Sequence, residues 1–222
     1  MQPRKNMIKI HIIGGSSSGK TTLAESLSSR FAVPHYELDK ISQKNGTQMA
    51  ESLNDAFSIA EQPGWVTEGS YIIWTDPLLY QADYIVLLEI PWPVAASRMI
   101  RRHISKSLRG INPYPGVNGI KLLVKLLKDN HNHYLNKVPS HSPKAAFMRR
   151  YFEEYGERRE PPDAEILLRC LERDGISVPP TAAFVRRYLK KYQEKVFFIR
   201  NKADQERLLG RIKQHLCSSS DT

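Results

Sequence analysis

The stretch GGSSSGKTT, Gly14 to Thr22, constrains this chain more than any other part of its sequence. It follows a short β-branched run, Met7 to Ile13, which is typical of a buried strand. It precedes apolar residues at helical spacing, which predict a helix that begins near Gly19 or Lys20. A glycine- and serine-rich loop is therefore expected between a strand and the start of a helix.

The pattern Gly14-x4-Gly19-Lys20-Thr21 matches the phosphate-binding loop. Backbone amides can turn inward around a polyphosphate where side chains do not obstruct them, and the helix start adds free N–H groups and a positive dipole end. In this pattern Lys20 reaches the β- and γ-phosphates, and the Thr21 hydroxyl ligates Mg²⁺. A flexible turn before a helix is the alternative. The predicted phosphate-binding residues are Gly14, Gly15, Ser16, Ser17, Ser18, Gly19, Lys20, Thr21 and Thr22.

Four further strands are predicted after the loop. They cover residues 33–38, ending at Asp39; 65–67, ending in Glu68-Gly69; 83–90, closed by Pro91; and 196–199. Helical patterns separate them, and between residues 102 and 195 only helical stretches broken by prolines are found. Alternation of strands and helices indicates an α/β protein with a mostly parallel five-stranded sheet in a three-layer α/β/α arrangement.

The same pass predicts the domain organisation. Residues 1–102 and 195–217 form a nucleoside-triphosphate-binding core, and residues 103–194 form a helical lid and acceptor insertion. Residues 218–222 are expected to be a frayed tail.

The composition limits which partners and which cellular compartment are expected for this protein. The net charge is +10, and from Arg98 to Arg150 there are twelve lysines or arginines and a single acid, Asp129. Such a segment could bind phosphate-bearing small molecules, nucleic acid or an acidic membrane surface, or it is simply a solvated face. The two cysteines lie far apart, and no long apolar span exists. We therefore expect a cytoplasmic protein without a transmembrane segment.

Acidic residues stand where a doubly wound sheet binds ligands. Ligands collect beyond the carboxyl ends of parallel strands, and Asp39, Glu68 and Glu89 lie at or near such ends. Phosphoryl transfer requires positioning and charge neutralisation, so these acids and nearby arginines are candidates for the site. Glu89, within a hydrophobic run, is interpreted as a buried structural acid or a supporting partner.

Several blocks carry a resemblance to a family. VPHYELDKI, GWVTEGSYIIW, ADYIVLLEIPWPVAASRMIRR and KVFFIRNKADQERLL, taken with the loop, resemble the adenylate-kinase-like P-loop kinases. Within these, the chain is most similar to the small group labelled DNA topology modulation proteins. The resemblance covers residues 7 to about 102 and 195 to about 212, and it implies ATP and Mg²⁺ as cofactors.

The resemblance also implies roles for individual residues. Asp39 would orient or deprotonate the acceptor hydroxyl; a helix N-cap or an exposed turn is the alternative. Glu68, where relatives carry Asp, would hold a Mg²⁺-bound water or the acceptor. Arg98 and Arg102 share a helix face and would clamp the transferring phosphoryl group; surface arginines are the alternative. With Lys20, the predicted catalytic residues are thus Asp39, Arg98 and Arg102, and the metal residues are Thr21 and Glu68.

Two smaller expectations follow from the resemblance. Tyr71 would line the acceptor pocket or pack in the core. The segment Arg200 to Ala203 stands where this fold cradles adenine with its backbone.

The insertion has an amphipathic helix and two aromatic-basic segments. In the helix, residues 119–135, Ile120, Leu123, Leu127 and Tyr134 are predicted to form an apolar seam. Packing on neighbouring helices is favoured over a membrane surface. Metal binding by its two histidines is not expected. FMRRYFEEY and FVRRYLKKYQ could stack on bases, but amphipathic helices explain both.

Three function hypotheses remain. The leading one is an ATP- and Mg²⁺-dependent kinase acting on a small hydroxyl-bearing or anionic acceptor. The second is a nucleotide-binding regulator that contacts nucleic acid through its basic insertion, and the third is an ATP-binding protein with residual hydrolysis only. The acceptor and the oligomeric state are not determined by the sequence.

Overall fold

A computed structural model of the chain describes residues 8–112, 116–156 and 161–218. The strands are β1 (Lys9–Gly14), β2 (His35–Glu37), β3 (Trp65–Glu68), β4 (Tyr84–Leu88) and β5 (Val196–Ile199). The helices before β5 are α1 (Lys20–Phe31), α2 (Leu38–Asn45), α3 (Met49–Ala60), α4 (Asp76–Gln81), α5 (Trp92–Leu108), α6 (Gly116–Tyr134), α7 (Pro143–Glu154), α8 (Ala164–Asp174), α9 (Ala182–Tyr188) and the 3₁₀ helix η1 (Leu189–Tyr192). The last helix is α10 (Lys202–Ser218).

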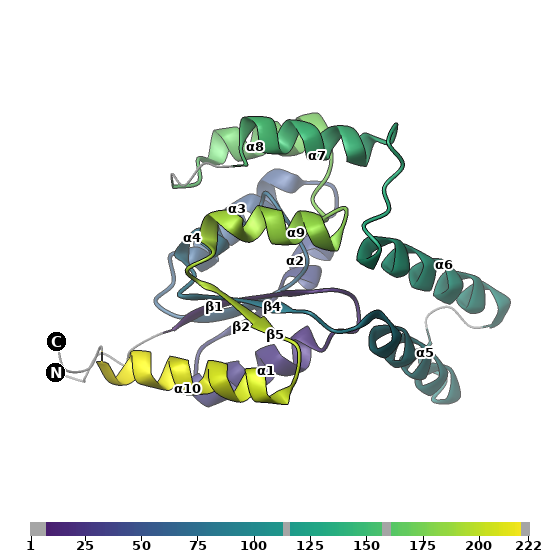
Figure 1. Cartoon of the computed structure of the whole chain (residues 1–222), viewed down its shortest axis with the longest axis horizontal. Helices are drawn as coiled ribbons and strands as arrows, with labels where there is room; N and C mark the ends of the chain where they lie inside the picture. Colours follow the sequence, from purple (N-terminus) through teal and green to yellow (C-terminus); the bar gives the residue numbers. More distant parts are fainter. Residues whose placement is uncertain (1–7, 113–115, 157–160, 219–222) are drawn as a thin grey trace.

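The described strands form a five-stranded sheet in the order β2-β3-β1-β4-β5. Every neighbouring pair is parallel. Helices α1 and α10 cover one face, while α2, α3, α4 and α9 cover the other (Figure 1). This confirms the predicted α/β/α fold. Because β1 is central, the loop that follows it lies at the middle of the carboxyl edge, between two strands on each side.

Two apolar clusters hold the layers together. Ile8, just before β1, and Ile10 and Ile12 within it pack with α1 and α10 through residues such as Leu27 and Leu208. Side chains from α3, α4 and the other face of the sheet form the second cluster. Burying these side chains provides the main favourable free energy of folding, about 1.5–3 kcal/mol for each fully buried Leu, Ile or Phe.

The chain between β4 and β5 divides into two parts. Helices α7, α8 and α9 share the second cluster with α3 and α4, through residues such as Phe147, Leu171 and Tyr188. Helices α5 and α6 extend beyond the carboxyl edge of the sheet (Figure 1). The predicted aromatic-basic segments form α7 and α9, and their rings pack together in this core, with Tyr151 and Tyr188 at 5.4 Å between centroids. These buried rings therefore serve packing.

Several local expectations need correction. The second strand ends at Glu37, and Asp39 lies in the first turn of α2, a helix that the sequence did not predict. An acid there complements the positive end of the helix dipole, while Leu38 anchors the turn in the core. Helix α4 was also missed, and β4 ends before Glu89. Ser218 belongs to α10, whereas residues 219–222 lie outside the described residues.

The predicted seam of α6 is wrong at one position. Ile120 is 57% exposed, and the residues that are buried are Gly119 and Asn130. The polar end of α6 turns toward the phosphate loop instead, as described below. Among the described residues, no helix combines the length and the apolar character needed to cross a membrane.

Candidate phosphoryl-transfer site

The loop between β1 and α1 has the backbone that its glycines predict. Gly19, with φ 100°, occupies the left-handed region and caps α1. A Cβ on Gly14 would lie 2.7 Å from the Ser18 hydroxyl and 2.9 Å from Leu88 Cβ, so this position requires glycine. Ser17 has φ 60°, a conformation that is costly for a residue with a Cβ. The loop therefore holds strain at the point where a ligand would contact its amides.

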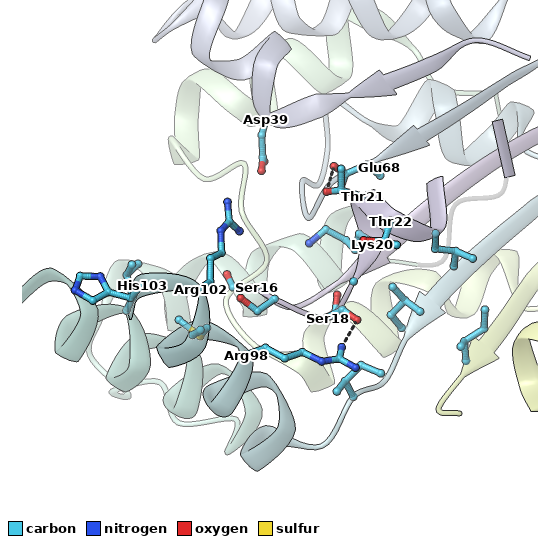
Figure 2. A pocket seen from close by; sticks show the side chains of 18 of the residues that line it. Ser16, Ser18, Lys20, Thr21, Thr22, Asp39, Glu68, Arg98, Arg102 and His103 are labelled. Atoms are coloured by element: carbon cyan, nitrogen blue, oxygen red, sulfur yellow. Dashed lines mark hydrogen bonds between the residues drawn. The ribbon is translucent and has the colours of Figure 1, made fainter. Parts of the chain in front are cut away.

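Neighbouring elements fix the loop. The Ser70 hydroxyl donates a hydrogen bond to the Gly14 carbonyl from just beyond β3. Arg98, on α5, donates to the Ser18 carbonyl at 3.0 Å (Figure 2). The backbone N–H of Ser18 closes a turn with the Gly15 carbonyl at 3.2 Å. The loop is thus held from both flanks of the sheet.

Lys20 lies near the carboxylates of Glu68 and Asp39. Its ammonium donates to the Gly15 carbonyl at 3.2 Å. Burial lowers the pKa of Lys20, while the nearby charges of Glu68 and Asp39 raise it. Figure 2 shows Lys20, Asp39 and Arg102 pointing into one space beside the loop. An ammonium desolvated near acids is well placed to exchange its carbonyl contact for a phosphate oxygen.

Thr21 and Glu68 form an oxygen pair. The Thr21 hydroxyl donates to Glu68 Oε1 at 2.9 Å (Figure 2), and Glu68 is only 3% exposed although it carries a carboxylate. In the part of the chain that the structure describes, no group of three His, Cys, Asp or Glu side chains surrounds a metal position. The pair fits Mg²⁺, which uses one or two protein oxygens and completes its shell with water and substrate phosphates.

These residues line a cavity of about 1,120 Å³ at the carboxyl edge of the sheet. Its walls include most of the predicted site, namely residues 16–22 with Asp39, Glu68, Arg98 and Arg102. Arg200, Asn201 and Lys202, predicted near the base, lie on the same wall as Ile199 at the end of β5. The structure thus brings the predicted residues together, apart from Gly14 and Gly15, which line a neighbouring cavity.

The remaining strand-end residues have other partners. Glu89 accepts hydrogen bonds from Arg186 at 2.7 Å and from Arg200 at 2.9 Å. This agrees with its interpretation as a supporting acid. Tyr71 packs against Trp74 with tilted rings, 5.0 Å between centroids, and burial is the main cause of its raised pKa. Tyr71 is thus a partly buried residue that packs against the core.

Sequence reasoning missed the residues that α6 brings to the loop. His131 packs against Trp92 of α5 with tilted rings, 5.0 Å between centroids, and the Tyr134 ring lies 6.3 Å from the same indole ring. The hydroxyl of Tyr134 in turn lies against Gly15. The only available signal was a cluster of polar residues, DNHNHY, at the end of an otherwise apolar helix.

The chain resembles known proteins over part of its length. No family model matches the sequence. An uncharacterized protein, YqaC, of Bacillus subtilis (strain 168) is 31% identical over 104 residues, which is 44% of this chain. The match spans 57% of the length of that relative.

Solved structures that resemble part of this chain include kinases of small molecules. A shikimate kinase from Acinetobacter baumannii in complex with shikimate is 19% identical, with 56% of this chain and 76% of that chain covered and a TM-score of 0.37. A gluconokinase from Sinorhizobium meliloti 1021 is 16% identical, with 61% and 100% covered and a TM-score of 0.35. At such scores the likeness is partial, and the fold assignment rests on the sheet order and loop of this chain itself. The adenylate-kinase-like subgroup stays a prediction.

Proposed function

We propose that the protein is a P-loop kinase that transfers the γ-phosphoryl group of ATP, with Mg²⁺, to a hydroxyl of a small molecule. The observation that carries the proposal is the convergence of Lys20, the Thr21–Glu68 pair and Arg98 on one cavity beside a strained glycine loop. ATP, rather than another nucleoside triphosphate, is inferred from family resemblance.

Each residue has a physical task in this proposal. The amides of residues 15–20 and the start of α1 bind the phosphates. Lys20 neutralises charge at the β- and γ-phosphates, and Thr21 with Glu68 holds Mg²⁺. The metal ion neutralises developing charge on the phosphate oxygens when it is bound. Catalysis by such a site depends on positioning and electrostatics rather than on covalent intermediates.

The arginines and Asp39 complete the step. Arg98 and Arg102 project from α5 toward the loop (Figure 2) and are proposed to stabilise the charge on the transferring group. The acceptor oxygen forms a bond to phosphorus as the bond to the β-phosphate oxygen breaks, and ADP leaves. The proton of the acceptor hydroxyl passes to the Asp39 carboxylate.

The test is a screen for acceptor-dependent ADP release with sugars, sugar acids, nucleosides and nucleotides as acceptors, run with wild type and Lys20→Ala. Lys121→Ala is the matched control, because Lys121 is exposed on α6 and lies outside both cavities. We expect Lys20→Ala to abolish transfer while its circular dichroism stays unchanged. Full activity in Lys20→Ala, or failure of the wild type to bind Mg·ATP, would refute the proposal.

A further inference from the structure

A second cavity, of about 560 Å³, adjoins the phosphate loop. Gly14, Gly15 and Ser16 line it on the loop side, and the ends of α6 and α9 line it on the other. The two cavities share Ser16 of the loop and also Leu88, Ile90, Leu126 and Arg200, so they adjoin at the loop and beside the ends of β4 and β5. The volume lies in the range of small-molecule sites, about 300–1,000 Å³.

A buried polar side chain without a partner faces this cavity. Asn130, on α6, is 9% exposed, and its side-chain oxygen Oδ1 has no hydrogen-bond partner among the described residues. Buried polar atoms are nearly always hydrogen-bonded, because leaving one unpaired costs about 1–3 kcal/mol. Oδ1 can only accept a hydrogen bond, so the missing partner is a donor such as a hydroxyl group.

Tyr134 gives a second unpaired group on the same wall. Its hydroxyl is buried and has no partner in the described part of the chain, and burial raises its pKa, so it stays protonated. Its ring lies near Trp92, and Trp92 packs against His131. Asn130 and Tyr134 are four residues apart, so they lie on the same face of α6. This face presents a hydrogen-bond acceptor, Asn130 Oδ1, beside a hydroxyl that can donate and accept, which suits a molecule with several hydroxyl groups.

The charges of the cavity limit the ligand further. Three cationic side chains, Lys144, Arg186 and Arg200, and two acidic ones, Glu89 and Asp129, line it, which leaves one positive charge in excess. Glu89 already pairs with both arginines, at 2.7 and 2.9 Å. Burial lowers the pKa of His133, which favours its neutral form. The cavity is therefore suited to a neutral or singly negative ligand rather than to a second polyphosphate.

We propose that this second cavity is the acceptor site and that it takes a small polyhydroxylated molecule, neutral or with one negative charge. One ligand hydroxyl donates to Asn130 Oδ1 and another pairs with the Tyr134 hydroxyl. The reacting hydroxyl lies at the Ser16 end, where the two cavities meet. The assignment of the ligand as acceptor rests on the proposed function, whereas binding in the cavity can be tested without nucleotide.

The protein carries a reporter for this binding. Trp65 and Trp74 are buried in the core, whereas Trp92 is partly exposed and lies beside Tyr134. Titration of the full chain with D-sorbitol, myo-inositol and D-gluconate, with uridine as a comparison, is followed by tryptophan fluorescence. Trp92→Phe identifies the signal, and isothermal calorimetry provides a second measurement of affinity.

Asn130→Leu removes the unpaired oxygen with little change of size, and Tyr134→Phe removes only the hydroxyl. Asn118→Leu is the matched control, because Asn118 is exposed on the same helix and lines neither cavity. We expect at least one hydroxylated probe to bind. Each site variant should lower the affinity for this probe about tenfold, which corresponds to the loss of one hydrogen bond. Asn118→Leu should leave the affinity unchanged.

The possible outcomes separate the two proposals. If no hydroxylated probe binds at millimolar concentrations, or if a probe binds equally to Asn130→Leu and Tyr134→Phe, the acceptor site is not in this cavity. If Asp39→Asn weakens binding while Asn130→Leu and Tyr134→Phe do not, the body of the ligand lies in the first cavity, which Asp39 lines, and the inference is also overturned. If a probe binds as expected but Mg·ATP does not bind, the cavity assignment stands as a ligand site and the kinase proposal fails.

Discussion

The hydroxyl of Tyr134, at the end of α6, lies so close to Gly15 in the phosphate loop that a Cβ at Gly15 would stand 2.8 Å from it. This contact joins the helix that extends beyond the sheet to the loop at its centre. It also places the polar end of α6 at the second cavity, which Asn130 and Tyr134 line. Helix α6 is therefore part of the site, although most of its length is exposed.

Gly15→Ala is expected to disturb this contact. The new methyl group must displace a Tyr134 ring that packs near Trp92, and such overpacking costs about 1–3 kcal/mol. Differential scanning calorimetry measures the loss as a lower melting temperature. In the double variant with Tyr134→Phe, part of the stability returns, because the closest atom is removed. If the decrease in melting temperature of the double variant equals the sum of the decreases of the two single variants, Tyr134 does not contact Gly15 as the structure describes.

Glu68→Gln tests the metal role. The amide keeps the size of the side chain and can still pair with Thr21, but it removes the negative charge from the oxygen pair. Loss of a ligand or of its immediate support lowers metal affinity by about 10- to 100-fold. We expect a corresponding increase in the Mg²⁺ concentration that gives half-maximal activity, measured at saturating ATP. An unchanged Mg²⁺ dependence would remove Glu68 from the metal site.

Arg98→Ala compared with Arg101→Ala tests the arginine that binds the loop. Arg98 donates to the Ser18 carbonyl at 3.0 Å, whereas Arg101, three positions along α5, does not line either cavity. Removal of one preorganised donor to the transition state lowers kcat by about 10²–10³. We expect a loss of this size for Arg98→Ala and little change for Arg101→Ala in steady-state kinetics. Equal kcat values for the two variants would argue for a surface role of Arg98.

Acidification is expected to destabilise the protein through His11. This side chain is 0% exposed and shares a 2.7 Å hydrogen bond with the Thr67 hydroxyl, and burial lowers its pKa to about 3. The unfolded chain binds the proton near pH 6.5 and the folded chain only near pH 3. The free energy of unfolding therefore falls as the pH decreases through this window, by up to about 1.4 kcal/mol per pH unit.

Urea denaturation at about pH 7 and about pH 5 measures the loss, expected to be about 2 kcal/mol over this interval for one proton. His11→Asn should have a smaller loss, while His141→Asn, at an exposed position, should keep that of the wild type. If the free energy of unfolding changes equally with pH in His11→Asn and the wild type, groups other than His11 bind the proton.

The sequence determined the sheet and the loop, because these depend on local patterns. β-branched runs marked β1, β4 and β5, and Pro63-Gly64 marked the end of α3, since each pattern acts within a few residues. Lys20 and Thr21 follow Gly19 directly, so their place at the start of α1 was also a local property. Helices α2 and α4 were missed because they are short, with Leu38 and Leu79 buried by distant partners rather than by their own periodicity.

Only the tertiary structure decided what surrounds the loop. Ser70, Arg98 and Tyr134 come from different segments of the chain, and no spacing in the sequence relates them to Gly14, Ser18 or Gly15. Their meeting depends on strand order and on how α5 and α6 pack, that is, on long-range burial of apolar surface. For the same reason the unpaired oxygen of Asn130 is visible only in the fold: whether a polar atom lacks a partner depends on every segment that packs around it.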